Sequence, residues 1–113
     1  MNISFEGFGQ KCLTFMTDEK LEPGTIVKMD DSGKVTASGD DDIFIGYVVN
    51  SDDEYAVVCI SGVAVLPCSD DDIEPGYVGL STDSTGKVCD GLNSKLRLVL
   101  AADTQAGTVT VIL

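Results

Sequence analysis

The chain has no histidine and no tryptophan among its 113 residues, and it has only three tyrosines and three prolines. Without histidine, the Ser-His and Cys-His pairs of nucleophilic catalysis cannot form. A zinc site would have to be built from cysteine sulfur alone. The sequence also contains neither a P-loop nor a glycine-rich dinucleotide motif. We therefore expect no catalytic residues, no cofactor and no enzymatic activity.

Basic residues are few as well, with seven Lys and Arg against 19 Asp and Glu, which gives a formal net charge of −12. Such a surface repels nucleic-acid phosphates and anionic membranes. No apolar run approaches the ~20 residues that span a bilayer, and the N-terminal MNISFEGFGQK lacks the pattern of a signal peptide. The sequence predicts no nucleic-acid partner, no membrane association and synthesis in the cytoplasm.

The four cysteines, Cys12, Cys59, Cys68 and Cys89, form no Cys-x-x-Cys pair, so their spacing does not indicate a metal site. Free cysteine is often a small buried hydrophobe. We interpret the four in this way, in a reducing compartment, with disulfides as the alternative.

Carboxylates are the remaining candidates for chemistry, but they cluster in predicted turns. A glycosidase needs two of them across a groove. Calcium needs six to eight oxygen ligands around one point, whereas consecutive Asp residues in an extended chain point in alternating directions. We predict solvated turn residues and no metal site, with calcium binding as an open alternative, for the runs at 30–31, 40–42, 52–54 and 70–72.

One phrase occurs twice: LEPGTIVKMDDSGKV at 21–35 and IEPGYVGLSTDSTGKV at 73–88. The Glu-Pro-Gly triplets lie 52 residues apart and the Gly-Lys-Val triplets lie 53 apart. In each copy, apolar and polar side chains alternate up to a short turn that contains glycine, and a second short run follows. This pattern predicts a β-hairpin in each copy.

Each hairpin is followed by a strand–turn–strand pattern, at 43–61 and at 95–113, with Asp52 and Asp103 at matching places. No window keeps helical periodicity without a break. We predict an all-β fold, either a compact β-barrel or two packed sheets, built from related units at about 21–61 and 73–113. Residues 21–113 then form one domain after an N-terminal extension at 1–20. The predicted structural turn residues are Pro23, Gly24, Gly33, Gly46, Gly62, Pro75, Gly76 and Gly86.

The chain resembles the capsid decoration, or head cement, proteins of tailed bacteriophages and prophages. The resemblance covers about residues 10–113 and rests on the two Glu-Pro-Gly to Gly-Lys-Val segments, IGYVV around Gly46, VCISGVAVLP around Gly62 and Pro67, and the closing AGTVTVIL. It implies a non-enzymatic protein that binds the exterior of an assembled capsid through the major capsid protein, often as a homotrimer. It would be made in the bacterial cytoplasm and end on the virion.

Three of the four phenylalanines lie in the first 15 residues. Apolar side chains on an arm outside the repeated units can dock on a partner surface. We predict the capsid contacts Ile3, Phe5 and Phe8. Phe15 is instead expected to cover an open end of the protein's own barrel, and this covering role is the alternative for Phe5 and Phe8. The alternative function is a carbohydrate- or cell-surface-binding β-module. Such modules stack sugars on exposed aromatic residues, which are scarce in this chain.

Overall fold

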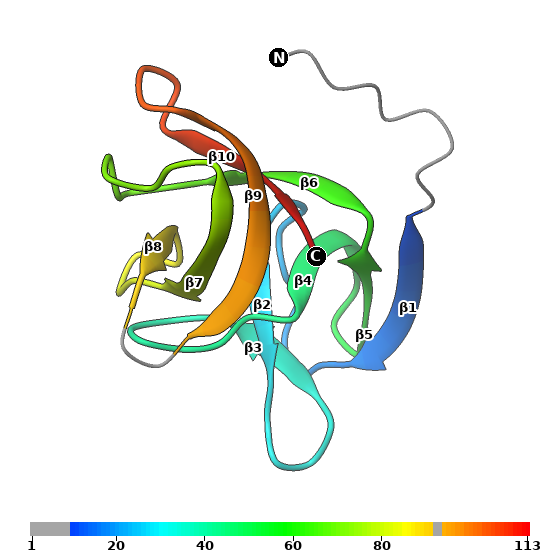
Figure 1. The fold of residues 1–113 in the computed structure, drawn as a ribbon. Helices are drawn as coiled ribbons and strands as arrows, with labels where there is room; N and C mark the ends of the chain where they lie inside the picture. The colour runs from blue at the N-terminus through cyan, green and yellow to red at the C-terminus, as the bar shows by residue number, and fades with distance from the viewer. Residues whose placement is uncertain (1–9, 92–93) are drawn as a thin grey trace.

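The computed structural model describes residues 10–91 and 94–113 and contains two packed antiparallel sheets (Figure 1). Within these ranges there are ten strands and no helix, and so no helix long and apolar enough to cross a membrane. The prediction of an all-β fold is confirmed, in its form of two packed sheets.

The first sheet has the strand order β1-β5-β4-β2-β3. Its second and third strands in the sequence form the first predicted hairpin, which turns at Gly33 with a φ of 85°. A side chain is strained at such a positive φ, whereas glycine adopts it freely. The strand bounds are β1 Lys11–Met16, β2 Ile26–Met29, β3 Val35–Ala37, β4 Gly46–Ser51 and β5 Tyr55–Ser61.

The second sheet repeats this arrangement with the order β6-β10-β9-β7-β8. Its hairpin turns at Gly86, where φ is 81°. Adding five to each strand number of the first sheet gives the strand order of the second. The duplication therefore extends to all ten strands. The bounds are β6 Val63–Pro67, β7 Gly76–Thr82, β8 Val88–Asp90, β9 Lys95–Asp103 and β10 Thr108–Ile112.

The two sheets share one irregularity. The register of β4 against β5 shifts between Val48 and Asn50, and the register of β9 against β10 shifts at Leu100, opposite the step from Thr110 to Val111. A bulge inserts one residue and bends the strand locally. Because both bulges follow a buried valine, Val48 and Val99, they bend the two sheets at equivalent places.

The duplication begins earlier than the sequence pattern indicated. Strand β1 lies inside the predicted extension at 1–20, and β6 lies in the segment between the two predicted units. Both are edge strands, paired with β5 and β10 respectively. Their sequences, KCLTFM and VAVLP, share no residue pattern, so the amino-acid sequence alone does not show that the two strands are equivalent.

The predicted turn glycines separate into two groups. Gly24, Gly33, Gly62, Gly76 and Gly86 all have positive φ, as expected for turns and strand ends. Gly46 instead begins strand β4. Its lack of a side chain allows close strand approach, because an added Cβ would lie 2.0 Å from the carbonyl oxygen of Cys59. The two predicted prolines, Pro23 and Pro75, each precede one of the positive-φ glycines.

Two hydrophobic clusters form the core. The smaller lies within the first unit and includes Val27, Val35 and Val58. The larger is built mainly from the second unit, with Leu80, Val99 and Val111 fully buried. Ile26 and Phe44 of the first unit also belong to the larger cluster, so the two units share it.

Arg97 of β9 joins the units through a polar contact within this core. It is 5% exposed, its guanidinium lies 4.5 Å above the ring of Phe44, and its Nη2 donates to the Phe44 carbonyl. Burial lowers the pKa of Arg97 because the charged form loses hydration. Within the described residues its Nε has no hydrogen-bond partner. The ring and the carbonyl of Phe44 are therefore important compensation for a buried charge.

Candidate functional site

A row of apolar side chains crosses four strands of the second sheet. Val63 of β6 is paired with Ile112 of β10, Ile112 is paired with Leu98 of β9, and Leu98 is paired with Tyr77 of β7. Side chains that are directly opposite on neighbouring strands lie on the same face of the sheet. The four residues therefore form one continuous row.

This row faces away from the core. The neighbouring residues Ala64, Val99 and Val111 point the other way and are buried in the larger cluster. Val65 and Leu96 lie on the same outer side, on the strands that carry Val63 and Leu98. We call these residues the apolar face: Val63, Val65, Tyr77, Leu96, Leu98 and Ile112.

The apolar face contains the three most exposed large hydrophobic side chains of the described residues. Tyr77 is 75% exposed, Leu96 is 68% exposed and Val65 is 61% exposed. Single exposed hydrophobic residues are ordinary, whereas several on one sheet face indicate a surface that contacts something. This face consequently stands as the candidate functional site.

Most of the equivalent row of the first sheet is covered by the rest of the molecule, whereas Cys12 at its outer end is exposed. It runs through Cys12, Cys59, Tyr47 and Ile26, which are paired across β1, β5, β4 and β2. Cys59 is fully buried, Ile26 is 3% exposed and belongs to the larger cluster, and Tyr47 packs against that cluster. Three of the four positions are thus an internal contact in the first unit, and the equivalent positions lie on the outer side of the sheet in the second.

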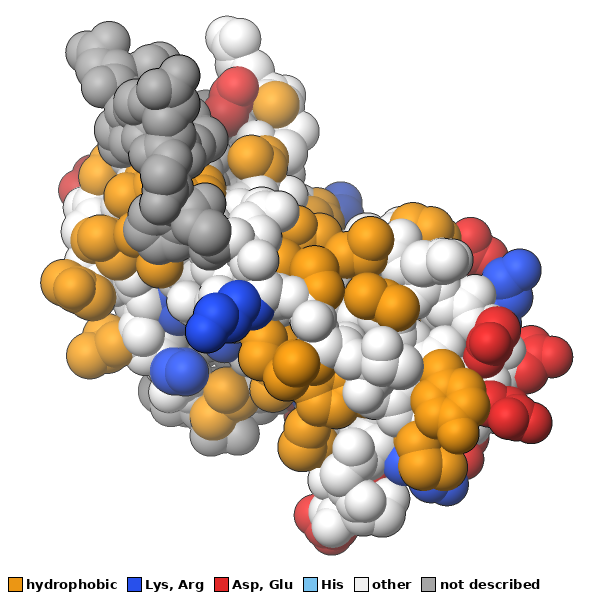
Figure 2. Space-filling view, turned by 90° about the vertical axis from the view of Figure 1, so that its right-hand side faces the viewer, with side chains coloured by type: hydrophobic (Ala, Val, Ile, Leu, Met, Phe, Trp, Pro, Cys, Tyr) orange, Lys and Arg blue, Asp and Glu red, His pale blue; other side chains and the backbone are white. Residues whose placement is uncertain are grey.

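Charge on the molecule is separated from apolar surface. Figure 2 shows hydrophobic side chains close together over much of one side of the molecule, with most acidic side chains in that view toward its edges. The apolar face itself contains no carboxylate. A partner with an apolar contact surface could approach there without desolvating an acidic residue of the face.

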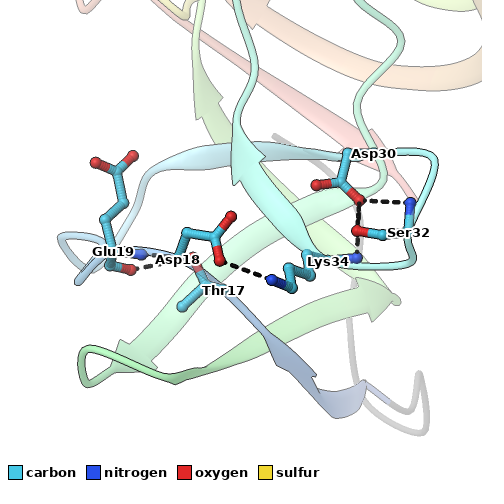
Figure 3. A network of polar contacts seen from close by, with 6 residues as sticks. All are labelled: Thr17, Asp18, Glu19, Asp30, Ser32 and Lys34. Atoms are coloured by element: carbon cyan, nitrogen blue, oxygen red, sulfur yellow. Dashed lines mark hydrogen bonds and ion pairs between the residues drawn. The ribbon is translucent and has the colours of Figure 1, made fainter.

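The acidic residues Asp30 and Asp83 of the hairpin turns accept hydrogen bonds from residues of the same turn. The Oδ1 of Asp30 accepts hydrogen bonds from the amide and hydroxyl of Ser32, at 2.9 and 2.7 Å, and from the amide of Lys34 at 3.1 Å (Figure 3). The ammonium of Lys34 in turn contacts Asp18 at 2.8 Å. These hydrogen bonds lower the pKa of Asp30 and make it a structural turn residue.

Asp83 occupies the equivalent place in the second unit. Its Oδ1 accepts from the amide and hydroxyl of Thr85, at 2.8 and 2.6 Å, and from the amide of Lys87 at 3.1 Å. Hydrogen bonds from the side chains of Ser69 and Thr85 hold the pKa of Asp83 well below its usual range. The ionised form is therefore favoured in the folded state more than in the unfolded chain.

We expect Asp83→Asn to be less stable than the parent at pH 7 and to lose this disadvantage in acid. The contribution of a carboxylate with a depressed folded-state pKa is complete above the unfolded-state value of about 4 and declines as the pH falls below it. Urea unfolding at pH values from 7 to 2 measures the difference in the free energy of unfolding between the parent and the variant. Thr85→Ala should show a smaller difference with the same pH dependence. A difference that does not change with pH in either variant would contradict this role of Asp83.

Other acidic positions do not form a ligand site. Asp52 and Asp103 each accept two backbone N–H bonds in their own turns. Asp42 is bonded to the amide of Gly39 and to the ammonium of Lys28 at 2.8 Å. Among the described residues, no group of three or more Cys, Asp and Glu side chains is arranged to hold a metal ion.

An open hollow lies beside the first hairpin turn. It contains the Lys28–Asp42 ion pair, so its cation is already neutralised by a carboxylate. The hollow is open to solvent, which distinguishes it from the enclosed apolar pockets that bind small molecules. Its lining residues are Lys28, Met29, Asp30, Asp31, Ser32, Asp42 and Ile43.

The capsid contacts predicted from the sequence, Ile3, Phe5 and Phe8, lie outside the described residues. The apolar face was not predicted as a site. Tyr77, Leu96, Leu98 and Ile112 belong to segments predicted as strands, whereas Val63 and Val65 lie in the segment between the two predicted units. The outward direction of all six depends on the register of four strands that are distant in the sequence. Only the apolar alternation in TVTVIL and KLRLVL could have indicated which residues share a side.

Comparisons of the chain with protein-family models, curated proteins and solved structures found no match. The residues and geometry of the apolar face are consequently the main evidence for function.

Proposed function

We propose that the protein is a structural component of a tailed-phage or prophage-derived particle that binds and stabilises the exterior of the capsid shell. The observation that carries this proposal is the uncovered apolar face of the second sheet. In the equivalent row of the first sheet, Cys59 and Ile26 are buried and Tyr47 packs against the larger core cluster, so these positions form an internal contact surface. The sequence resemblance to decoration proteins supplies the identity of that partner, the major capsid protein.

The fold suits a part that resists force and performs no chemistry. Both sheets are antiparallel, and the sheets share a core through Phe44 and Ile26. The acidic turns keep the remaining surface hydrated and repel nucleic acid in an infected cell. In this account the apolar face lies against the shell while the acidic turns face solvent.

The double variant Tyr77→Ser, Leu96→Ser tests the proposal. Both side chains are mostly exposed in the free protein, so the melting temperature should change by only about 2 °C. If both are buried on the shell, losing them should weaken capsid binding by at least about 30-fold. Co-sedimentation with purified capsids, from the phage whose head genes neighbour this gene, measures binding.

A matched control is available on the first sheet. Tyr55 and Leu13 are 47% and 50% exposed and lie outside the apolar face. Tyr55→Ser, Leu13→Ser should bind capsids like the parent protein. Equal binding by both double variants would overturn the role of the apolar face. A variant lacking residues 1–9, in the same assay, tests the separate prediction of contacts at Ile3, Phe5 and Phe8.

The alternative of a carbohydrate-binding module predicts a different result. Tyr77 is the one strongly exposed aromatic residue of the apolar face, and a sugar would have to stack on it. Under that alternative, Tyr77→Ser alone abolishes binding to a glycan array and capsid binding is absent in the parent. Capsid binding together with no glycan binding supports decoration.

A further inference from the structure

Two of the four cysteines are direct neighbours on adjacent strands. Cys12 of β1 is the register partner of Cys59 of β5, immediately after the register shift at Lys11. Opposite residues of an antiparallel pair have Cα atoms about 4.5 or 5.5 Å apart, and both values lie within the range that a disulfide spans. Their side chains also lie on the same face of the sheet.

The two thiols have complementary environments. Cys12 is exposed, whereas Cys59 is fully buried and its Sγ lies 3.3 Å from the carbonyl oxygen of Ser61. Tyr47 is the partner of Cys59 on its other side. Loss of hydration and the neighbouring Cys59 thiol raise the pKa of Cys12. Burial and the same thiol raise the pKa of Tyr47. The three side chains therefore form one contact group.

We propose that Cys12 and Cys59 are a redox-active pair that forms a disulfide across the edge of the first sheet. The reaction partner is a small disulfide such as oxidised glutathione. The Cys12 thiolate attacks one of its sulfurs and releases one glutathione thiolate. Cys59, once deprotonated, attacks the Cys12 sulfur and releases the second. The two protein thiols lose two electrons and two protons, and one glutathione disulfide becomes two thiols.

The bond would secure the least supported strand of the first sheet. Strand β1 is an edge strand, paired only with β5 among the described residues, and five of its six residues are exposed. The disulfide would close a loop from residue 12 to residue 59 and hold β1 on the sheet. It forms through contacts within this chain, so it does not depend on whether the protein binds a capsid.

The other two cysteines provide an internal control. Cys68 forms a parallel bridge with Val88, the residue before Cys89, and packs against the larger core cluster. Successive residues of a strand point to opposite faces, so Cys89 points away from the side on which Val88 is buried. The Sγ of Cys89 lies 3.8 Å from the Ser81 hydroxyl oxygen, and the Cys68 thiol donates a hydrogen bond to the Asp70 carbonyl. This pair is not aligned for a disulfide.

The experiment equilibrates the reduced protein with oxidised glutathione and then counts free thiols in denaturant. Of the four thiols in the parent, two should remain, and a peptide joining Cys12 to Cys59 should appear by mass spectrometry. The variant Cys68→Ser, Cys89→Ser should retain none. Its oxidised form should melt about 10 °C higher than its reduced form, and dithiothreitol should reverse the shift.

The controls are Cys12→Ser and Cys59→Ser, which should show no shift of this kind. Four remaining thiols in the parent would overturn the proposal. So would a bond between Cys68 and Cys89, or glutathione attached to Cys12 with Cys59 still free. Because the readout is made on the isolated protein, failure here is distinguishable from failure of capsid binding.

Discussion

Gly46→Ala is expected to destabilise the fold by roughly 3 kcal/mol, at the upper end of the cost of overpacking. An alanine Cβ would lie 2.0 Å from the carbonyl oxygen of Cys59 and 2.9 Å from its carbonyl carbon. Both atoms belong to the backbone of β5, an interior strand of the first sheet, so no side-chain rotation relieves the contact. Strands β4 and β5 would have to separate where they support the first sheet. Urea unfolding followed by circular dichroism measures the loss.

Gly39→Ala is the matched control for this prediction. Its added Cβ would meet only the Oδ2 of Asp42, at 3.5 Å, which is an ordinary contact distance. We expect a change within about 0.5 kcal/mol, as for most substitutions that create no clash or cavity. A Gly46→Ala protein as stable as Gly39→Ala would show that β4 and β5 can separate freely, contrary to the close strand approach described here.

Phe44→Ala is expected to cost roughly 4 kcal/mol, as large-to-small substitutions of buried aromatic residues do. Phe44 is 1% exposed and lies in the core cluster shared by the two units. The substitution also removes the ring beneath the Arg97 guanidinium, so a buried charge loses part of its compensation. The expected loss should exceed that of Phe44→Leu, which retains most of the apolar contact.

A double-mutant cycle with Arg97→Met separates the two contributions. If the ring stabilises the guanidinium, Phe44→Ala should cost less in the Arg97→Met background, by about 0.5–2 kcal/mol. Equal costs in both backgrounds would show that the cation–π contact contributes nothing. A cost below about 1 kcal/mol for Phe44→Ala alone would contradict the shared core itself.

The hairpins could be predicted from the sequence because their determinants are local. Turn residues such as Asp30 and Gly33 fix the chain within a few positions, and the same residues recur around Gly86. The edge strands β1 and β6 could not be matched in this way. Their equivalence depends on pairing with β5 and β10, which follow much later in the chain.

The features that connect the two units were also inaccessible from the residue pattern. Arg97 and Gly46 occupy equivalent register positions, opposite Val78 and Val27. In the second unit that position holds a buried cation that reaches Phe44, and in the first it holds no side chain at all. Duplication predicts similar backbones, but it does not predict where the two copies must differ in order to pack together.

The apolar face illustrates the same limit for function. Several of the strands β6, β7, β9 and β10 have apolar residues on both sides. The sequence therefore does not show which side of each strand faces the core. Which side is buried becomes evident only when Ala64, Val99 and Val111 are seen in the core. The remaining side, with Tyr77 and Leu96, is then identified as surface.

Electron cryomicroscopy of capsids incubated with the purified protein tests the proposed function most directly. We expect added density at regular positions on the outer surface of the shell. The second sheet should lie nearest the shell, with Tyr77 and Leu96 at the contact, and the turns that carry Asp30 and Asp52 should face solvent. Bare capsids at saturating protein concentration, or density with the second sheet turned outward, would contradict it.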